Sequence, residues 1–294
     1  MTPILSVVIP SHCRADLLAE CLESLRLHAP PRVEIIVVDD ASAEGIVSTT
    51  ALRFPNVRVV RLARQSGFCV AANVGIATAT APVVEMLNDD TEVTAGWAEA
   101  ALRCFDDPKV VAVAPLVLQL DPERRAAGSP PLIDSAGDTY DSGGFATKRW
   151  HGRSLSERAV RKCEPVWGTS ASAAFYRRAA LLDAGGFPHD FGAYFEDVDL
   201  AHRLNRAGGI TLFQPACVVW HRVSASYGRS PSREVLVRQS RNEERVFWRN
   251  ITGLRLLWNL PRHAAVLLGK AYLRMRERTF RPWMRGRLQA WGIG

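Results

Sequence analysis

Short hydrophobic runs and helical repeats alternate along the first half of the chain. Runs rich in β-branched residues predict strands at Ile4–Ile9, Val33–Val38, Val57–Leu62, Val83–Leu87 and Val110–Ala114. Between these runs, apolar residues recur every three or four positions, which is the spacing of amphipathic helices. Strands and helices that alternate in this way predict an α/β fold: a doubly wound, mostly parallel sheet with right-handed crossovers and helices on both faces.

The pattern changes in the second half of the chain. Residues 120–162 lose all periodicity and are rich in Gly, Ser, Pro and charge. This segment is too long for an ordinary connection and is expected to be functional or partly mobile. Helices are predicted from Arg177 and from Glu196. Two short strands are predicted at Ile210–Phe213 and Cys217–Trp220.

Charge divides the chain into two parts. Residues 1–228 carry 22 Lys and Arg against 26 Asp and Glu, a net charge of −4, whereas residues 229–294 carry 15 against 4, a net charge of +11. The second part is helical from about Arg233, and Pro282 is expected to break or kink it. We therefore expect one domain over 1–228 and a basic helical extension over 229–294. A uniform nucleic-acid-binding surface would not be divided in this way.

The remaining composition describes an ordinary globular protein, with 47% hydrophobic and 23% charged residues. The six cysteines are scattered without a C-x-x-C pair, which argues against a disulfide framework or a zinc site and fits a reducing cytosol. We see neither a signal peptide nor an apolar run long enough for a membrane span. The expected location is cytoplasmic, either soluble or peripheral on the inner face of the cell membrane.

A cluster of short polar side chains follows the strand predicted at Val83–Leu87. Asn88, Asp89 and Asp90 come at the carboxyl end of that strand, where open α/β sheets place their ligands. Carboxylate oxygens are hard donors that suit Mg²⁺ or Mn²⁺, and clustered carboxylates need a compensating charge when buried. A solvated turn is the structural alternative. The position at a strand end favours a cation site.

Three further polar groups have both a structural and a functional interpretation. Asp40 ends the second predicted strand, where it would contact a nucleotide or cap a turn. Glu196 and Asp197 open a helix, where carboxylates stabilise the helix N-terminus or where one of them acts as a general base. His221 follows a strand and is either a metal ligand or a hydrogen-bonded loop residue. Trp167 is either an acceptor-stacking platform or a core residue.

Together, these stretches resemble the inverting glycosyltransferase family 2, especially its rhamnosyltransferase-like bacterial members. The resemblance covers residues 4–250, including Arg241-Asn242, and implies the GT-A fold. Four of the blocks that carry it are Ser6–Arg14, Val38–Ser42, Gly67–Gly75 and Leu87–Thr91. The fifth runs from Gly185–Phe187 to Glu196–Leu200 and is accompanied by His221. The chain departs from the family pattern at Asn88, which replaces the first acid of a strict D-x-D, and at Gln65, His12 and Cys13.

The resemblance implies a role for each matching position. The nucleotide would be bound by Pro10, Arg14, Asp40, Gln65, Asn73 and Asp89. Asp90 and His221 would hold Mn²⁺ or Mg²⁺. Asp197 would be the catalytic base, and Glu196 would place the acceptor.

The expected activity is metal-dependent, inverting transfer of a sugar from a nucleoside-diphosphate sugar to a glycan or lipid-linked glycan acceptor, in cell-surface polysaccharide synthesis. One alternative is a nucleotidyltransferase that makes nucleotide sugars, although Pro10-Ser11-His12 lacks the Gly-rich loop with basic residues of that class. The other is a decayed glycan-binding scaffold. The basic, Trp-containing helices predict contact with an anionic membrane surface or a homodimer.

Overall fold

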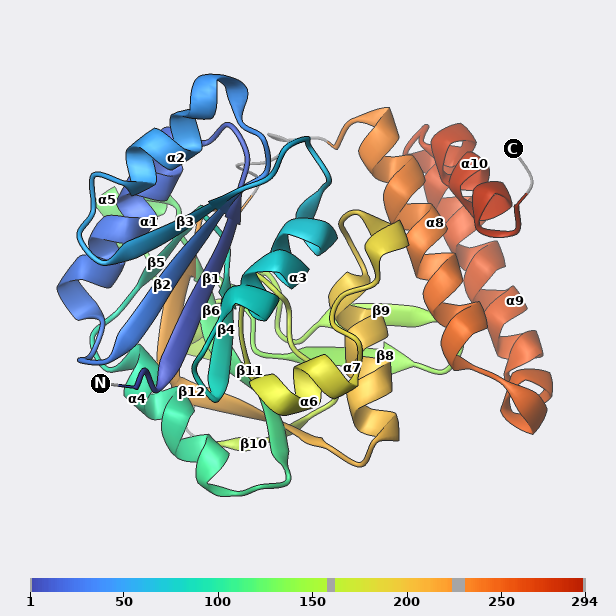
Figure 1. Cartoon of the computed structure of the whole chain (residues 1–294). Coiled ribbons are helices and arrows are strands. Elements are labelled where there is room, and N and C mark those ends of the chain that lie inside the picture. The colour runs from blue at the N-terminus through green and yellow to red at the C-terminus, as the bar shows by residue number, and fades with distance from the viewer. Residues whose placement is uncertain (1, 158–161, 224–230, 293–294) are drawn as a thin grey trace.

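The computed structural model, described for residues 2–157, 162–223 and 231–292, places the strands predicted in the first half in one sheet (Figure 1). The strands are β1 (Leu5–Ser11), β2 (Val33–Asp39), β3 (Val57–Arg61), β4 (Val83–Leu87), β5 (Thr91–Val93), β6 (Val110–Gln119), β7 (Ile133–Ser135), β8 (Asp138–Asp141), β9 (Phe145–Lys148), β10 (Glu164–Val166), β11 (Ala173–Arg177) and β12 (Ile210–His221). The α-helices are α1 (Ala15–His28), α2 (Ile46–Ala51), α3 (Phe68–Thr78), α4 (Trp97–Leu102), α5 (Pro122–Ala126), α6 (Arg178–Asp183), α7 (Glu196–Arg206), α8 (Arg233–Asn250), α9 (Gly253–Arg276) and α10 (Phe280–Ala290).

The main path of the sheet has the order β10-β12-β6-β11-β4-β1-β2-β3. Strands β4, β1, β2 and β3 are parallel, which confirms the doubly wound half of the prediction. The sheet as a whole is mixed, because β11 pairs antiparallel with both β4 and β6. Since parallel strands end at the same edge, the polar residues that follow β1, β2 and β4 come together there.

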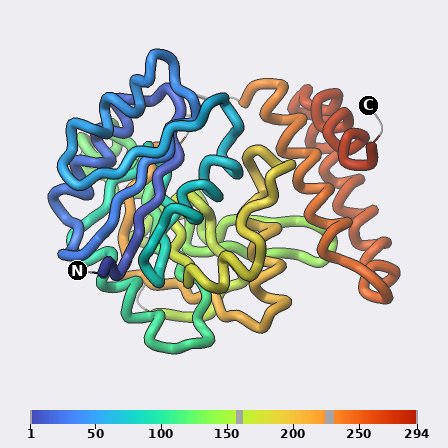
Figure 2. The backbone as a smooth tube through the Cα atoms, viewed as in Figure 1, coloured from blue at the N-terminus to red at the C-terminus, as the bar shows by residue number. Residues whose placement is uncertain are grey.

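Helices cover both faces of the sheet, as the hydrophobic pattern predicts (Figure 2). Successive side chains of β1 alternate between two cores: Val7 and Ile9 pack with α1, α2 and α4, whereas Val8 packs with α3, α6 and α7. Helix α3 lies so close to the sheet that a Cβ on Gly75 would come within 2.2 Å of the Val8 side chain. Close packing therefore explains this glycine.

The segment 120–162 is more regular than its sequence suggests. It contains β7, which extends the sheet beside β6, and the β8–β9 hairpin, in which Asp138 pairs with Lys148. These strands are three or four residues long and carry polar side chains, so they leave no hydrophobic period to detect. A second difference from the prediction concerns the two short strands before His221. They form one strand, β12, whose pairing register with β6 shifts between Gln214 and Val218.

The basic extension forms three helices on the side of the sheet away from α1 and α2 (Figure 1). The predicted break occurs at 277–279, where Arg278 has a φ of +58°, and not at Pro282. Pro282 lies in the first turn of α10, where a missing N–H costs no hydrogen bond. None of the described helices has both the length and the apolar composition that a membrane span requires.

Charged side chains form part of the contact between these helices. Glu244 is fully buried and accepts a hydrogen bond from Arg287 at 2.6 Å, while Glu243 pairs with both Arg287 and Lys270. Burial acts to raise the pKa of Glu244, but contacts with His263 and Arg287 outweigh it and lower the pKa to about 2. The expected boundary at 228–229 lies outside the described residues, and the division into two domains stays a prediction.

Candidate active site

One cleft of about 560 Å³ opens at the carboxyl ends of the parallel strands. It is lined by residues from the ends of β1, β4 and β12, from the 120–162 segment, and from the start of α7. The cleft brings together seven of the residues singled out in the sequence: Pro10, Arg14, Asn88, Asp90, Glu196, Asp197 and His221. The two acidic centres, which lie far apart in the chain, therefore open into the same space.

Asp90 is buried and lies among positive groups. Arg14 donates a hydrogen bond from Nη1 to Asp90 Oδ2 at 3.0 Å, and His221 Nε2 lies 3.3 Å from Asp90 Oδ1. Burial alone would raise the pKa of Asp90, but the His221 contact and the charges of His221 and Arg14 lower it. Asp90 is therefore an anion at neutral pH.

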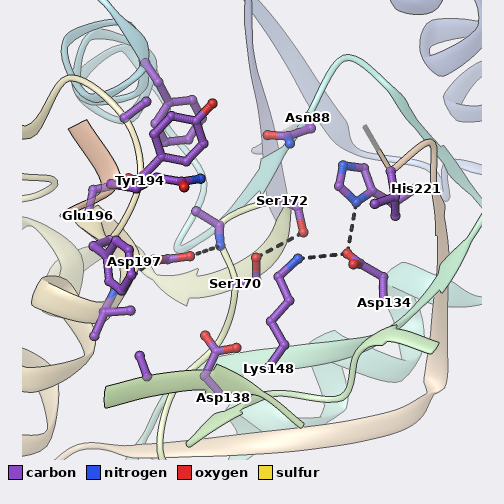
Figure 3. A pocket seen from close by; sticks show the side chains of 18 of the residues that line it. Asn88, Asp134, Asp138, Lys148, Ser170, Ser172, Tyr194, Glu196, Asp197 and His221 are labelled. Carbon is purple, nitrogen blue, oxygen red and sulfur yellow. Dashed lines mark hydrogen bonds and ion pairs between the residues drawn. The ribbon is translucent and has the colours of Figure 1, made fainter. Parts of the chain in front are cut away.

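The second ring nitrogen of His221 is held by a carboxylate that sequence reasoning did not assign (Figure 3). Asp134 Oδ2 lies 3.0 Å from His221 Nδ1 and also accepts a hydrogen bond from Lys148 Nζ at 2.9 Å. His151 contacts the same residue through the Asp134 carbonyl at 2.8 Å. Despite burial, these partners hold the pKa of Asp134 far below its ordinary value. A carboxylate behind a histidine in this way is typical of histidines that ligate metals.

Asp90 and His221 fit a divalent cation as a partial ligand set. Among the described residues, Asp90 Oδ1 is buried and accepts no hydrogen bond of regular geometry. The same part of the chain has no group of three or more His, Cys, Asp or Glu side chains arranged around a metal position. Mg²⁺ commonly takes only one or two carboxylates from a protein and completes its shell with water and substrate phosphates. The donor set therefore suits a cation shared with a diphosphate.

The second acidic centre lies at the first turn of α7. Asp197 Oδ2 accepts a hydrogen bond from the Ala171 N–H at 3.1 Å, and Asp197 Oδ1 accepts one from the Val198 N–H at 2.8 Å. Burial raises the pKa of Asp197, and these backbone donors oppose that shift. Burial and the charge of Asp197 raise the pKa of Glu196 to about 8. A carboxylate with an elevated pKa beside a cleft can take up a proton from a substrate.

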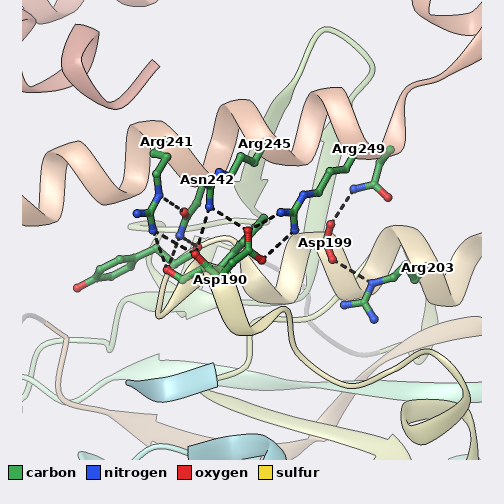
Figure 4. A network of polar contacts seen from close by, with 10 residues as sticks. Asp190, Asp199, Arg203, Arg241, Asn242, Arg245 and Arg249 are labelled. Atoms are coloured by element: carbon green, nitrogen blue, oxygen red, sulfur yellow. Dashed lines mark hydrogen bonds and ion pairs between the residues drawn. The ribbon is translucent and has the colours of Figure 1, made fainter. Parts of the chain in front are cut away.

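The loop before α7 is strained and is held by α8 (Figure 4). Tyr194 and Phe195 have φ values of +72° and +64°, which are costly for residues with side chains. Asn242, a buried residue of α8, donates from Nδ2 to the carbonyl oxygens of Phe191, Ala193 and Tyr194 at 2.9–3.0 Å. Helix α8 thus fixes the backbone immediately before Glu196, which sets the position of the second acidic centre.

Comparison with known proteins identifies the family. The family model described as Glycosyl transferase family 2 matches residues 6–184, more than half of the chain. The chain belongs to glycosyltransferase family 2. It is an enzyme of the glycosyltransferase type, with the rhamnosyltransferase-like character that its motifs suggest.

Curated relatives and solved structures agree with this assignment. The N-acetylglucosaminyl-diphospho-decaprenol L-rhamnosyltransferase of Mycobacterium tuberculosis is 29% identical over 246 residues, which cover 79% of this chain and 80% of the relative. The mannosyltransferase PcManGT of Pyrobaculum calidifontis, solved with GDP-Man and Mn²⁺, aligns with a TM-score of 0.62 at 19% identity over 99% of this chain and 88% of its own. GalNAc-T7, solved with UDP, GalNAc and Mn²⁺, also gives 0.62 at 20% identity over 83% of this chain, which spans about half (48%) of that protein. The solved structures support the GT-A fold.

Several residues expected to bind the nucleotide have other contacts in this glycosyltransferase. Asp40 accepts hydrogen bonds from the backbone N–H groups of Ser66 and Gly67 at 2.6 and 2.8 Å, so its carboxylate fixes the turn before α3. The side chain of Asn73 donates to the Phe187 carbonyl and accepts from the Phe187 N–H, both at 2.8 Å. Neither residue is among those that line the cleft.

The other three expected contacts also lie outside the cleft lining. Asp89 is fully buried, forms an ion pair with Arg14 at 2.5 Å and accepts a hydrogen bond from Ser11, so it orients Arg14. Gln65 is exposed in the turn before α3. Trp167 stacks on Tyr140 with ring centroids 5.0 Å apart, which favours the core interpretation of this residue.

The residues that sequence reasoning missed come from the 120–162 segment of the glycosyltransferase. Asp134, Asp138 and Lys148 line the cleft, and the end of the Lys148 side chain lies between Asp197 and Asp134 (Figure 3). Burial and the charge of Asp197 raise the pKa of Asp138 to about 8. The only signal for them was an unusually long polar segment, which indicated function without indicating which residues carry it.

Replacing Asp134 by Asn is expected to weaken Mn²⁺ binding about ten- to hundredfold, the usual effect of removing a carboxylate behind a ligating histidine. The amide cannot supply the negative charge that Asp134 places beside His221 Nδ1. The measurement is a Mn²⁺ titration in the presence of a nucleoside diphosphate, with Asp121→Asn, at a helix N-cap, as the matched control. Unchanged Mn²⁺ affinity in the Asp134 variant would remove this residue from a metal-positioning role.

Proposed function

We propose that the enzyme is a metal-dependent, inverting glycosyltransferase that moves a sugar from a nucleoside-diphosphate sugar to a hydroxyl of a saccharide or lipid-linked glycan, in cell-surface polysaccharide synthesis. One observation carries this proposal: Asp90 with His221, and Asp197, line the same cleft. One centre has the chemistry to bind a diphosphate through a cation. The other has the chemistry to accept a proton.

The donor is proposed to lie on the β1 and β4 side of the cleft. Asp90 and His221 would hold Mn²⁺ or Mg²⁺, which supplies charge neutralisation for the departing diphosphate when bound. Arg14, itself oriented by Asp89 and Asp90, adds positive charge on the same side. Pro10 lines the cleft there and offers a backbone carbonyl to the nucleotide.

The acceptor hydroxyl is proposed to lie at Asp197. Its oxygen forms a bond to the anomeric carbon while the bond from that carbon to the diphosphate oxygen breaks, and the Asp197 carboxylate takes the hydroxyl proton. The transition state is oxocarbenium-like, as in glycosidic bond cleavage generally. A single displacement inverts the configuration at the anomeric carbon. Glu196 and Asp138 border the acceptor on this side.

The relatives narrow the proposed substrates. The mycobacterial relative is named for transfer of L-rhamnose to N-acetylglucosaminyl-diphospho-decaprenol, so we propose a rhamnose-type sugar and a lipid-linked acceptor for this enzyme. Both of the solved structures named above contain Mn²⁺ and a nucleotide, which supports the same cofactor here. With a lipid-linked acceptor, the proposed location of the reaction is the cytoplasmic face of the cell membrane.

Isothermal titration with UDP, dTDP and GDP, each with and without Mn²⁺, tests this function. We expect one nucleotide to bind, with an affinity that rises at least about tenfold when Mn²⁺ is present, because a cation held by Asp90 and His221 would offset the negative charge of the diphosphate. Hydrolysis and transfer assays with sugars of the preferred nucleotide then identify the donor. A protein that binds none of the three nucleotides under either condition would be a scaffold and not a transferase.

A further inference from the structure

Helix α9 presents an apolar stripe to solvent along its whole length. The helix has 24 residues and spans about 36 Å at 1.5 Å per residue. The stripe consists of Leu254 (74% exposed), Leu257 (63%), Trp258 (83%), Leu268 (72%), Tyr272 (59%) and Met275 (56%). These positions recur every three or four residues, and Pro261, Ala264 and Ala265, also exposed, fill the interval between them. We call this surface the α9 stripe.

The opposite side of α9 is anchored to the protein. His263 is buried and stacks on Phe247 of α8 with ring centroids 3.6 Å apart. In Figures 1 and 2, α9 lies at the outer side of the helical extension, with α8 between it and the sheet. The α9 stripe is therefore a solvent-facing surface, and a single apolar patch this long on a rigid helix marks an interaction site.

Arginines accompany the α9 stripe. Arg255 and Arg276 each follow a position on the apolar face by one residue, and both are exposed, whereas Arg262 pairs with Asp141 of β8. The extension that contains them carries 15 basic against 4 acidic residues. An apolar helix face with cationic residues beside it is the pattern of a helix that lies in the plane of an anionic bilayer surface.

We propose that the α9 stripe docks the enzyme on an anionic membrane surface, with α9 parallel to the bilayer plane and its apolar side chains among the lipid headgroups and upper acyl chains. The charge distribution decides between this occupant and a second copy of the chain. Two α9 stripes packed face to face would place both sets of arginines at one interface, where they repel. Anionic lipid headgroups complement the same charges.

A groove lies between this surface and the catalytic cleft. It has a volume of about 480 Å³ and is lined on one side by Val266, Gly269 and Leu273 of α9. Its other side includes Ala146, Phe195 and Gln239, which also line the cleft. This step rests on the proposed function: a lipid-borne acceptor held in the bilayer beside α9 would approach Asp197 past the three residues that line both the groove and the cleft.

Vesicle flotation of the full chain tests the docking surface. We expect the enzyme to float with vesicles of phosphatidylglycerol and phosphatidylcholine at low salt, and to remain unbound with phosphatidylcholine alone. Combining Leu257→Glu with Trp258→Glu should lower the partition coefficient about tenfold or more, because two charges enter the apolar face. The matched control combines Leu27→Glu with Leu52→Glu, exposed leucines (60% and 69%) on the α1 and α2 side of the molecule.

Three results would overturn the proposal: no flotation of the unmodified enzyme at low salt, an equal loss in the control variant, or light scattering that shows a dimer which only the α9 variant breaks. The last would assign the stripe to a second copy. The nucleotide titration above is run on the same α9 variant and should be unchanged. If the unmodified enzyme floats with the vesicles but binds no nucleotide, the proposed function is rejected and the docking surface stands. If it binds nucleotide but does not float, the docking surface is rejected and the proposed function stands.

Discussion

Replacing Asp197 by Asn is expected to lower the turnover of sugar transfer at least about a hundredfold, the lower range for loss of a general base. The amide preserves the size of the side chain but cannot take the proton of the acceptor hydroxyl. Donor affinity should be unaffected, because Asp197 lies at the α7 side of the cleft and not at Asp90 and His221. Steady-state transfer rates and nucleotide titrations measure the two quantities separately.

Asp199→Asn is the matched control for this prediction. Asp199 lies in the same helical turn and pairs with Arg203 at 2.9 Å, but it does not line the cleft. Its replacement should lower thermal stability and leave turnover within a few-fold of the unmodified enzyme. Full activity of the Asp197 variant, or equal losses in both variants, would show that Asp197 is not the base.

The dependence of turnover on pH gives a second test of Asp197 as the general base. A general base works only when it is deprotonated, so turnover should fall about tenfold per pH unit below its pKa. Because burial raises the pKa of Asp197 above the ordinary value of 3.8, the acidic limb should lie above that value. In the Asp197→Asn variant, this limb should disappear from the residual activity.

Replacing Asp90 by Asn is expected to raise the Mn²⁺ concentration needed for half-maximal activity at least about a hundredfold, since even an outer carboxylate contributes ten- to hundredfold to metal affinity. The pKa of Asp90 is lowered, so the change removes a full negative charge from the proposed cation site. Both nucleotide affinity in Mn²⁺ and turnover should fall. Metal titrations of activity and of nucleotide binding give the two numbers.

Asp89, the residue before Asp90, provides the control for this prediction. Asp89→Asn removes the negative charge that pairs with Arg14, at a residue that lies outside the cleft lining. We expect the Asp89 variant to bind nucleotide more weakly through the displaced Arg14, with a Mn²⁺ requirement close to that of the unmodified enzyme. A larger metal defect in the Asp89 variant than in the Asp90 variant would exchange their roles.

The sequence predicted the parallel half of the fold because its strands are buried on both faces. Leu5–Ile9 is fully buried and apolar apart from Ser6, so the strand was evident, although β1 continues through Pro10 to Ser11. Short polar strands have no such signal, which is why β7, β8 and β9 were not anticipated. The break between α9 and α10 was misplaced at Pro282 for a related reason: proline disrupts a helix interior but is tolerated in a first turn.

The sequence predicted residues that line the cleft where a polar side chain directly follows a strand or opens a helix. Asp90 follows β4 and Asp197 opens α7, and both line the cleft. Asp134 could not be assigned, because its partners Lys148 and His221 lie 14 and 87 residues away in the sequence. Asn242 was noticed only as part of a family motif. Its three backbone contacts depend on how α8 packs on the loop before α7, which no local pattern encodes.

Local sequence also could not reveal the contacts of Asp40 and Asn73. Their side chains form hydrogen bonds with backbone groups of the turns beside α3 and before α7. Asn and Asp readily bond to backbone groups in turns, so residue type alone could not separate a turn-forming role from nucleotide contact. Their proposed nucleotide roles stay predictions.

A crystal structure of the enzyme with the nucleoside diphosphate that binds most tightly, together with Mn²⁺, tests the central claim most directly. The account predicts Mn²⁺ coordinated by Asp90 and His221 with the diphosphate as a further ligand, and open space between the diphosphate and Asp197 in which an acceptor hydroxyl fits. A nucleotide bound elsewhere, or one that leaves Asp197 on the far side of a protein wall, would contradict it.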